Sequence, residues 1–441
     1  MSFIHDRIIC FIFFIVIFSC TQKKKNPDYV AKVGQTVVSK DEFLRTYQDV
    51  ILYSKKVDSP ETRRKHTEKL IQKKLLALAG RENNLGLDSV SLEKIFFEEE
   101  LALREALFSL QISQQIPIIV DSILHDHFRW FNTEVHLRHL FFQNKAEADS
   151  VFTEINQDTA LFNLKAMNVF RDKELAESGG NLGWLQYNIL DPVLEKIAYT
   201  MKSDSISFPV RSAYGWHILH KKNERRNVFL AESDFQKQKQ WLKRQIKMKE
   251  QRILADNYVN ELMESKSVVI MDSLVFYVCG IMDSRIKNKN GNKLNYYLSV
   301  KDKEFIRTSL YDIKNETLAE FEGGKMTVED FIIRLETISM DVLTRDILVG
   351  FYRILRDIIL GQEARNLGLD KSESVRVRRR DAEDNYFAYT FISQFVFSQN
   401  KPDNAYHISG KKLNEITDSL SIKYPVLYNE TFLDTVFSNV K

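Results

Sequence analysis

The sequence predicts an α+β protein in which one compact α+β domain is flanked by mostly helical modules. Three observations predict this class. Apolar residues recur at helical spacing over long stretches near both ends of the chain. The 441 residues include only 15 glycines and 7 prolines, which is few for an all-β fold. Between the helical ends, the pattern runs strand, two helices, glycine-rich loop, helix and two strands.

Charge and length exclude some classes of function. The chain has 63 basic and 60 acidic residues, a net charge of +3. A nucleic-acid-binding protein usually shows a clear basic excess, so we expect no nucleic-acid partner. At roughly 150 residues per domain, the length predicts two or three domains. We expect neither a cofactor nor a metal ion.

The first 19 residues are predicted to be a signal peptide. Residues 8–18 are apolar, a length that suits a secretory signal and is too short to span a bilayer. Cys20 follows this run directly and resembles the lipidated first residue of a bacterial lipoprotein. An ordinary cleaved signal or an uncleaved anchor is the alternative. Because Cys10 lies in the removed segment, Cys279 would have no internal partner and the exported chain no disulfide.

Residues 20–130 are predicted to form an N-terminal helical module. Tyr29–Val38 predicts two short strands around Gly34. Ser39 is expected to cap a helix with an acidic first turn. Helical spacing continues to N-N-L-G-L-D, where Gly86 is the expected C-terminal cap, and a further long helix follows.

The same pattern returns near the other end of the chain. L-A-E-F-E-G-G-K-M-T-V-E-D-F aligns with V-A-K-V-G-Q-T-V-V-S-K-D-E-F and places Phe331 opposite Phe43. G-Q-E-A-R-N-L-G-L-D aligns with A-G-R-E-N-N-L-G-L-D and places Gly368 opposite Gly86. Two matches in the same order predict a second copy at about residues 318–395. Two copies are too few for a solenoid.

The middle segment, residues 131–226, is predicted to be one α+β domain. Glu134–Phe142 alternates apolar and polar residues and predicts a strand, and Pro192 is expected in the first turn of a helix. The charged segment 227–270 is expected to be a helical connector whose apolar stripe docks on a module. Residues 271–441 then form the C-terminal module.

The loop S-G-G-N-L-G-W, Ser178–Trp184, has three glycines in five positions. Glycine enters positive-φ conformations at little cost, so the stretch predicts a tight loop. It could cradle a phosphate, turn beside a cleft or form a hairpin corner. No Lys-Ser/Thr follows it, and it does not join a strand to a helix start, which argues against a phosphate site.

Five segments, in order, resemble the parvulin family of peptidyl-prolyl isomerases. They are L-R-H-L-F, G-G-N-L-G-W, V-L-E-K-I-A-Y-T-M, F-P-V and Y-G-W-H-I-L. The resemblance implies a four-stranded antiparallel sheet with helices and isomerase activity on Xaa-Pro bonds. The flanking modules resemble the helical chaperone parts of SurA-type and PrsA-type foldases, through V-A-K-V-G-Q-T-V-V.

The resemblance also assigns site residues by position. The family's paired histidines match His139 and His217. Its apolar proline pocket matches Leu182, Leu190 and Leu194. A polar position at the rim matches Tyr214, and a polar loop position matches Asp172. Asp172 takes the loop position only after a one-residue slip, because Lys173 occupies it without a gap. The histidines could transfer protons or form a hydrogen-bonded structural pair. We favour the structural pair, because the reaction breaks no bond.

Two departures from the family pattern weaken the expected site. The family usually has phenylalanine at position 194 and methionine at position 190, and a flat ring packs a proline better than leucine does. A single lysine after the first strand argues against phosphorylated substrates. The sequence thus predicts a lipid-anchored, extracytoplasmic foldase acting on unfolded exported chains. The alternative is a holdase whose parvulin domain binds peptide without turnover.

Overall fold

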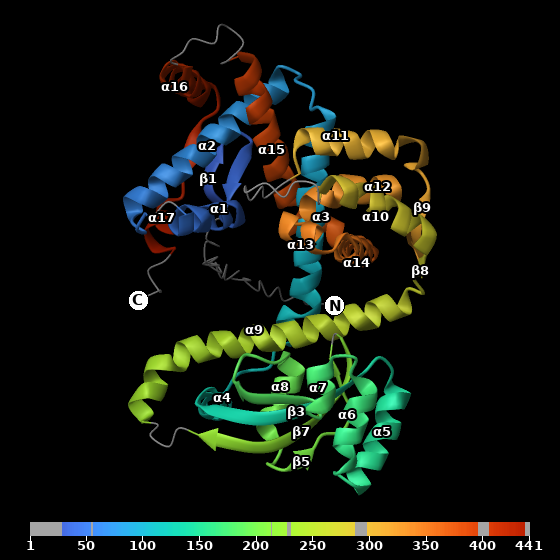
Figure 1. Cartoon of the computed structure of the whole chain (residues 1–441). Helices are drawn as coiled ribbons and strands as arrows, with labels where there is room; N and C mark the ends of the chain where they lie inside the picture. The colour runs from blue at the N-terminus through green and yellow to red at the C-terminus, as the bar shows by residue number, and fades with distance from the viewer. Residues whose placement is uncertain are drawn as a thin grey trace, which may run out of the picture. The chain divides into compact units, whose positions relative to one another are not determined.

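The computed structural model describes six stretches of the chain: residues 29–53, 56–212, 214–226, 231–286, 298–395 and 405–436. The predicted signal peptide and Cys20 lie outside these residues. The chain divides into two compact units (Figure 1). Unit 1 contains the residues up to Ile95 together with those from Val377 onward, and unit 2 contains Phe96–Arg376.

Unit 1 is built on a three-stranded antiparallel sheet that joins the two ends of the chain. β1 (Tyr29–Val33) and β2 (Thr36–Ser39) form the predicted hairpin around Gly34, whose φ is +55°. β11 (Val426–Tyr428) pairs with the other edge of β1. The residues from Val377 onward were expected in a C-terminal module, 271–441, but fold here instead. A three-residue strand has too short an apolar–polar pattern for its pairing strand to be predicted from the sequence.

Helices surround this sheet. They are α1 (Lys40–Tyr53), α2 (Pro60–Glu82), the start of α3 (Ser89–Gln111), most of α15 (Glu373–Phe395), α16 (Ala405–Lys423) and α17 (Glu430–Thr435). Ser39 Oγ accepts the Glu42 N–H at 3.0 Å, so the predicted cap is confirmed. The prediction for Gly86 is wrong. α2 ends at Glu82, and the left-handed residue after it is Asn84, with φ +52°, a conformation that asparagine tolerates.

A buried charge cluster fixes α15 against α1 and α2. Lys74 Nζ lies 2.9 Å from Glu42 and 2.8 Å from each of Asp381 and Asp384. All four residues are buried, and none is more than 4% exposed. Burial opposes ionisation of Lys74, but the three carboxylates hold its pKa above the ordinary value. Burial raises the pKa of Asp381 to about 6, with the Glu42 charge adding to the effect.

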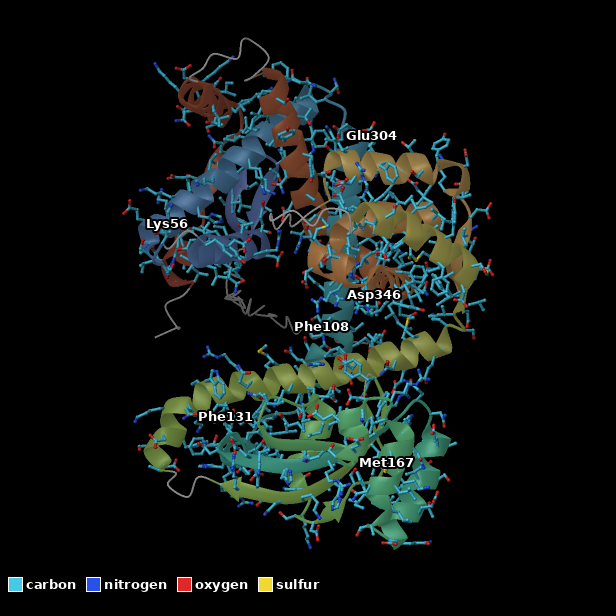
Figure 2. The ribbon with its side chains drawn as sticks, in the orientation of Figure 1. Lys56, Phe108, Phe131, Met167, Glu304 and Asp346 are labelled. Carbon is cyan, nitrogen blue, oxygen red and sulfur yellow. The ribbon has the colours of Figure 1, made fainter. Side chains whose placement is uncertain are left out.

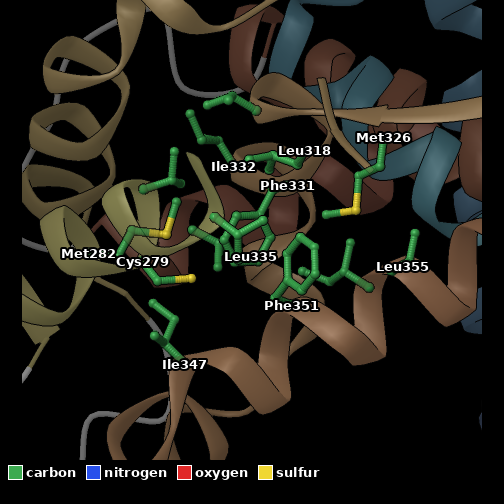
Figure 3. Close-up of a cluster of buried hydrophobic side chains, with 14 of the residues drawn as sticks. Cys279, Met282, Leu318, Met326, Phe331, Ile332, Leu335, Ile347, Phe351 and Leu355 are labelled. Atoms are coloured by element: carbon green, nitrogen blue, oxygen red, sulfur yellow. The ribbon is translucent and has the colours of Figure 1, made fainter. Parts of the chain in front are cut away.

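Unit 2 contains a second three-stranded sheet with the same hairpin-to-helix order. β9 (Thr317–Phe321) pairs with β10 (Gly324–Thr327), and the edge of β9 is completed by β8 (Val269–Ile270). Phe331 is fully buried, as Phe43 is in unit 1. Figure 3 shows Phe331 and Phe351 within this core; their rings meet edge to face, 5.6 Å between centroids.

The helical elements around the second sheet include both α-helices and short 3-10 turns. They are α10 (Asp272–Ile286), α11 (Val300–Ser309), η3 (Tyr311–Ile313), α12 (Val328–Arg334), η4 (Leu335–Thr337), α13 (Met340–Arg345), α14 (Ile347–Asn366) and η5 (Leu369–Lys371). α3 packs against α14 here through Leu103 and Ala364. In unit 1, α15 packs against α2. The long helix that follows each copy therefore packs against a helix of the other copy, α3 against α14 and α15 against α2.

The predicted central domain is an antiparallel sheet with helices on both faces. The strand order is β4-β3-β7-β5, with the short β6 also paired to β7. The elements are β3 (Thr133–Phe142), α5 (Lys145–Gln157), α6 (Leu161–Val169), α7 (Lys173–Glu177), β4 (Asn181–Gln186), α8 (Pro192–Thr200), β5 (Ser205–Ile206), β6 (Val210–Ser212) and β7 (Gly215–Arg226). The order agrees with the sequence pattern for β3, α5, α6 and α8, and Pro192 begins α8 as predicted. Three details differ: α7 precedes the glycine loop, that loop becomes the strand β4 from Asn181 onward, and β6 makes the sheet five-stranded, not four-stranded.

The charged connector is a single helix, α9 (Glu232–Ser265), as predicted. Its apolar stripe, Phe235, Leu242 and Ile246, packs against α4 (Asp121–Phe131), which follows the short turn η1 (Ser113–Gln115). Figure 1 shows α9 running along α4 and α8. Phe131, labelled in Figure 2, meets Trp241 of α9 edge to face. Within the described ranges, no helix combines the length and apolarity needed to cross a bilayer.

Candidate functional site

The glycine loop holds β4 against the backbone of β3 at His139. The His139 N–H donates to the Gly180 carbonyl at 2.8 Å, and Gly180 has φ +72°. A Cβ on Gly180 would lie 2.1 Å from the His139 carbonyl oxygen, so only glycine fits there. Of the three roles open to this loop, a tight turn beside a candidate site agrees best with this geometry.

A bulge in β4 follows immediately. Leu137 pairs with Gly183 and Arg138 pairs with Asn181, so Leu182 is the extra residue between two pairs. Gly183 has φ +73°, the left-handed conformation that a bulge often uses. A bulge re-aims one side chain, and here Leu182 packs into the apolar cluster on the β3–β7 face.

His139 and His217 come from the adjacent strands β3 and β7. Their rings are 6.2 Å apart between centroids and nearly parallel. His217 is buried, and His139 Nε2 and His217 Nδ1 are buried without a hydrogen-bond partner among the described residues. The expected hydrogen bond between the two imidazoles is therefore not present in the described structure. The two rings stack without pairing.

Sequence reasoning missed Ser212, which lies at the end of β6. Ser212 Oγ is 2.9 Å from His217 Nε2 and also accepts the Tyr214 N–H at 3.1 Å. The hydroxyl therefore fixes the His217 ring and the turn into β7. The signal was a serine two residues before Tyr-Gly, between the segments F-P-V and Y-G-W-H-I-L, but its role depends on a turn that sequence spacing does not define.

The three candidate pocket leucines lie together. Leu182, Leu190 and Leu194 pack in one cluster with Val135, Leu137 and Leu219 on the same sheet face as the histidines. Leu194 is buried, whereas Leu182 and Leu190 are partly exposed. Asp191 caps α8, because its Oδ1 accepts the Val193 N–H at 3.0 Å. An apolar surface thus lies beside the two histidines.

The remaining two candidates lie at the margin. Tyr214 is 69% exposed, as a rim residue would be. Asp172 is exposed and is the N-cap of α7, where its Oδ1 accepts the Leu175 N–H at 2.9 Å. Lys173 extends into solvent near Glu177. The described geometry gives Asp172 a structural task and does not bring it to the histidines, so its catalytic role stays a prediction.

Comparison with known families bears on this arrangement. Residues 142–223 match the family model described as "Rotamase: PPIC-type PPIASE domain". This chain carries a PPIC-type rotamase domain. The matched range includes the three leucines, Tyr214 and His217, whereas His139 lies three positions before its start.

Two curated relatives resemble parts of the chain. The foldase protein PrsA of Oceanobacillus iheyensis is 26% identical over 187 residues, which is 41% of this chain and 62% of that protein. The chaperone SurA of Sodalis glossinidius is 30% identical over 96 residues, 20% of this chain and 22% of that protein. The matches thus span less than two thirds of either relative.

Among solved structures, a peptidylprolyl isomerase (PrsA) from Bacillus anthracis is 21% identical, with a TM-score of 0.26. The matched region covers 48% of this chain and 93% of the solved structure's chain.

The rotamase domain offers an apolar, weakly charged site. Burial lowers the pKa of His139 to about 4, with the His217 ring adding to the effect, and burial also lowers the pKa of His217. Both imidazoles are therefore neutral at pH 7. Within the described residues, no group of three or more His, Cys, Asp or Glu side chains is placed to hold a metal ion. Such a surface can remove water from a peptide bond and hold an apolar ring, and its two imidazoles are uncharged at pH 7.

We predict that the rotamase domain loses stability as pH falls from about 6.5 to 4. His139 and His127 both have a pKa lowered to about 4 by burial, so the unfolded chain binds more protons in this window. Each imidazole should cost about 1.4 kcal/mol per pH unit below its ordinary pKa. Urea unfolding can be followed by fluorescence, since all four tryptophans lie in or beside this domain: Trp130, Trp184, Trp216 and Trp241.

His139→Gln is the control for this pH dependence. Removing one buried imidazole should make the fall in unfolding free energy between pH 6.5 and 4 shallower. An unchanged slope in this variant would show that groups other than His139 cause the acid sensitivity.

Proposed function

We propose that the rotamase domain catalyses cis–trans isomerisation of Xaa-Pro peptide bonds. The observation that carries this is the cluster of three leucines on the same sheet face as two neutral histidines, in a segment that overlaps the match to the rotamase family model. The pocket residues are Leu182, Leu190 and Leu194, with Tyr214 at the rim.

The chemistry asks little of charged groups. Rotation about the imide bond has a barrier of about 18–20 kcal/mol that arises from amide resonance, and no covalent bond breaks. Resonance weakens when the imide leaves water, so an apolar pocket that holds the twisted form lowers this barrier. The leucines would hold the proline ring. His139 and His217, neutral and stacked, would form one wall of the pocket, with Ser212 fixing the second ring.

The test is isomerase activity of the full chain on an Xaa-Pro peptide, with Leu194→Ala as the key variant. Burying a leucine side chain is worth about 1.5–3 kcal/mol, so kcat/KM should fall roughly 10- to 100-fold. Leu140→Ala is the matched control, because Leu140 is also buried but belongs to the cluster on the opposite sheet face. It should destabilise the domain and leave kcat/KM of the folded protein near wild type. Equal losses in both variants would contradict the pocket assignment.

For the whole protein, we propose a foldase that holds unfolded exported chains while their Xaa-Pro bonds isomerise. Uncatalysed isomerisation takes tens of seconds or longer, which is slow enough to limit folding. The partial similarity to proteins named foldase PrsA and chaperone SurA supports this role. Leu194, where the family usually has phenylalanine, favours the alternative of a holdase that binds peptide without turnover. A wild-type chain that binds a proline peptide but does not accelerate its isomerisation would select that alternative.

We also propose that Cys20 carries a lipid that anchors the protein on the outer side of a bacterial membrane. The support is the apolar run 8–18 that ends just before this cysteine. Metabolic labelling with a fatty-acid analogue should mark the wild type and leave Cys20→Ala unmarked. Cys279→Ala should keep the label, because this thiol is buried in unit 2. An unlabelled wild type would remove the anchor from the proposal.

A further inference from the structure

The N-terminal end of helix α8 contacts both the candidate pocket and the connector helix α9. Leu190 and Leu194, four residues apart, belong to the candidate pocket. Asp191 and Glu195 each follow one of these leucines in the chain, Asp191 as the N-cap of α8 and Glu195 in its first turn. Both carboxylates have partners on α9, the connector helix, which lies outside the residues matched to the rotamase model. Any movement of Asp191 and Glu195 therefore also moves Leu190 and Leu194.

Glu195 is the centre of the contact with α9. It is 1% exposed, and it forms an ion pair with Lys249 of α9. Its other oxygen accepts the Asn188 N–H, in the turn that leads from β4 into α8. Arg252, one helical turn beyond Lys249, lies 3.8 Å from Asp191, the cap of α8. One turn of α9 thus reaches both the cap and the first turn of α8.

Lys249 is itself held on a second side. Its Nζ lies 3.5 Å from the centroid of the Tyr187 ring, and the Tyr187 hydroxyl contacts His127 Nδ1 on α4. α4 is also where the apolar stripe of α9 docks. The lysine is therefore placed by its own helix and by Tyr187, which follows β4 and is itself held by α4, and it points toward Glu195.

The pair is costly to bury. Burial raises the pKa of Glu195 and lowers the pKa of Lys249, each against the pull of the other charge. Buried ion pairs often contribute little to net stability, and apolar residues of similar size can replace them without loss. A stabilising role therefore does not account for this pair. What it does supply is a single defined position of α8 relative to α9.

We propose that Lys249, assisted by Arg252, is a positioning residue of the rotamase site, which holds α8 so that Leu190 and Leu194 stay in register with the histidines. The inference rests on the proposed isomerase activity. It makes the connector helix part of the working site, although α9 contributes no residue to the pocket cluster. The site should then depend on α9 being docked.

The test compares Lys249→Met with Lys239→Met in the full chain. Lys239 lies on the same helix and pairs with Asp121 of α4, so its loss leaves α8 untouched. Two quantities are measured: hydrogen exchange of the backbone amides of residues 190–200, and kcat/KM on an Xaa-Pro peptide. For Lys249→Met we expect exchange to accelerate about tenfold and kcat/KM to fall roughly tenfold, since small displacements of positioning groups cost this much or more. Lys239→Met should change neither.

A double variant, Glu195→Gln/Lys249→Met, separates positioning from stability. It leaves no uncompensated buried charge, and the glutamine oxygen can still accept the Asn188 N–H. We expect its urea midpoint near the wild-type value while kcat/KM stays low, and Lys249→Arg to restore part of the rate. Recovery of full kcat/KM in the double variant would overturn the inference, as would unchanged α8 exchange in Lys249→Met. An inactive wild type would instead defeat the proposed function.

Discussion

Replacing Lys74 by methionine is expected to lower the free energy of unfolding of unit 1 by about 3–5 kcal/mol, the usual cost of leaving buried charges without their partner. Lys74 is 1% exposed and is the shared counter-ion of Glu42, Asp381 and Asp384. Three cations lie at the rim of the cluster. Lys73 pairs with Glu42, and Arg81 pairs with Asp384 and Glu383. Arg45 lies 3.4 Å from Asp381. All three are more exposed than Lys74 and do not replace it. Without Lys74, Asp381 loses its closest cation, and α15 loses its main polar tie to α2.

Hydrogen exchange is the suitable measurement for this variant, because the tryptophans all lie in unit 2. Amides of α2 and α15 should lose protection in Lys74→Met, while those of the rotamase domain keep theirs. Lys65→Met is the control on the same helix. Its pair with Glu61 is exposed and screened by water, so its loss should leave the free energy of unfolding almost unchanged. Equal protection of α15 in the two variants would show that the apolar contacts alone hold this helix.

Local sequence patterns predicted the elements of this protein well where a turn, cap or helix-start residue marks the end of the element. Gly34, Ser39 and Pro192 each stand at the turn, cap or helix start that their chemistry favours. The rotamase segment could be predicted because its strands, loop and helix follow one another in order. Its pocket leucines and both histidines came together for the same reason.

Long-range pairing could not be predicted in this way. The described residues between 377 and 436 fold with the N-terminal sheet through β11, a three-residue strand whose partner lies almost four hundred positions earlier. The sequence pattern also did not predict that α3 packs against α14 of the second copy and α15 against α2 of the first. Asp172 shows a further limit. A carboxylate before a short helix suits a cap and a catalytic role equally well, and the structure shows the cap, through the bond from the Leu175 N–H, while the catalytic role stays a prediction.

The glycine loop combines both cases. Three glycines predicted positive φ, and Gly179, Gly180 and Gly183 all have it, at +67°, +72° and +73°. The sequence did not show that these three glycines have different structural roles. Arg138 donates to the Gly179 carbonyl at 2.8 Å and holds the loop down. Gly180 lies against the backbone of β3, whereas a Cβ added to Gly183 would meet no other atom within 4 Å.

Gly180→Ala is therefore expected to destabilise the rotamase domain far more than Gly183→Ala. Both substitutions place alanine in a left-handed conformation, at a cost of about 1–2 kcal/mol. At Gly180 the new Cβ would also lie 2.1 Å from the His139 carbonyl oxygen, so β4 must move away and give up the bond from the His139 N–H. Overpacking of this kind adds about 1–3 kcal/mol. The total for Gly180→Ala is then about 2–5 kcal/mol, measured by urea unfolding with tryptophan fluorescence. Because β4 carries Leu182 and bonds to His139, kcat/KM of the folded fraction should fall as well. If the two alanine variants unfold at the same urea concentration, β4 is not held at His139 in the way the structure shows.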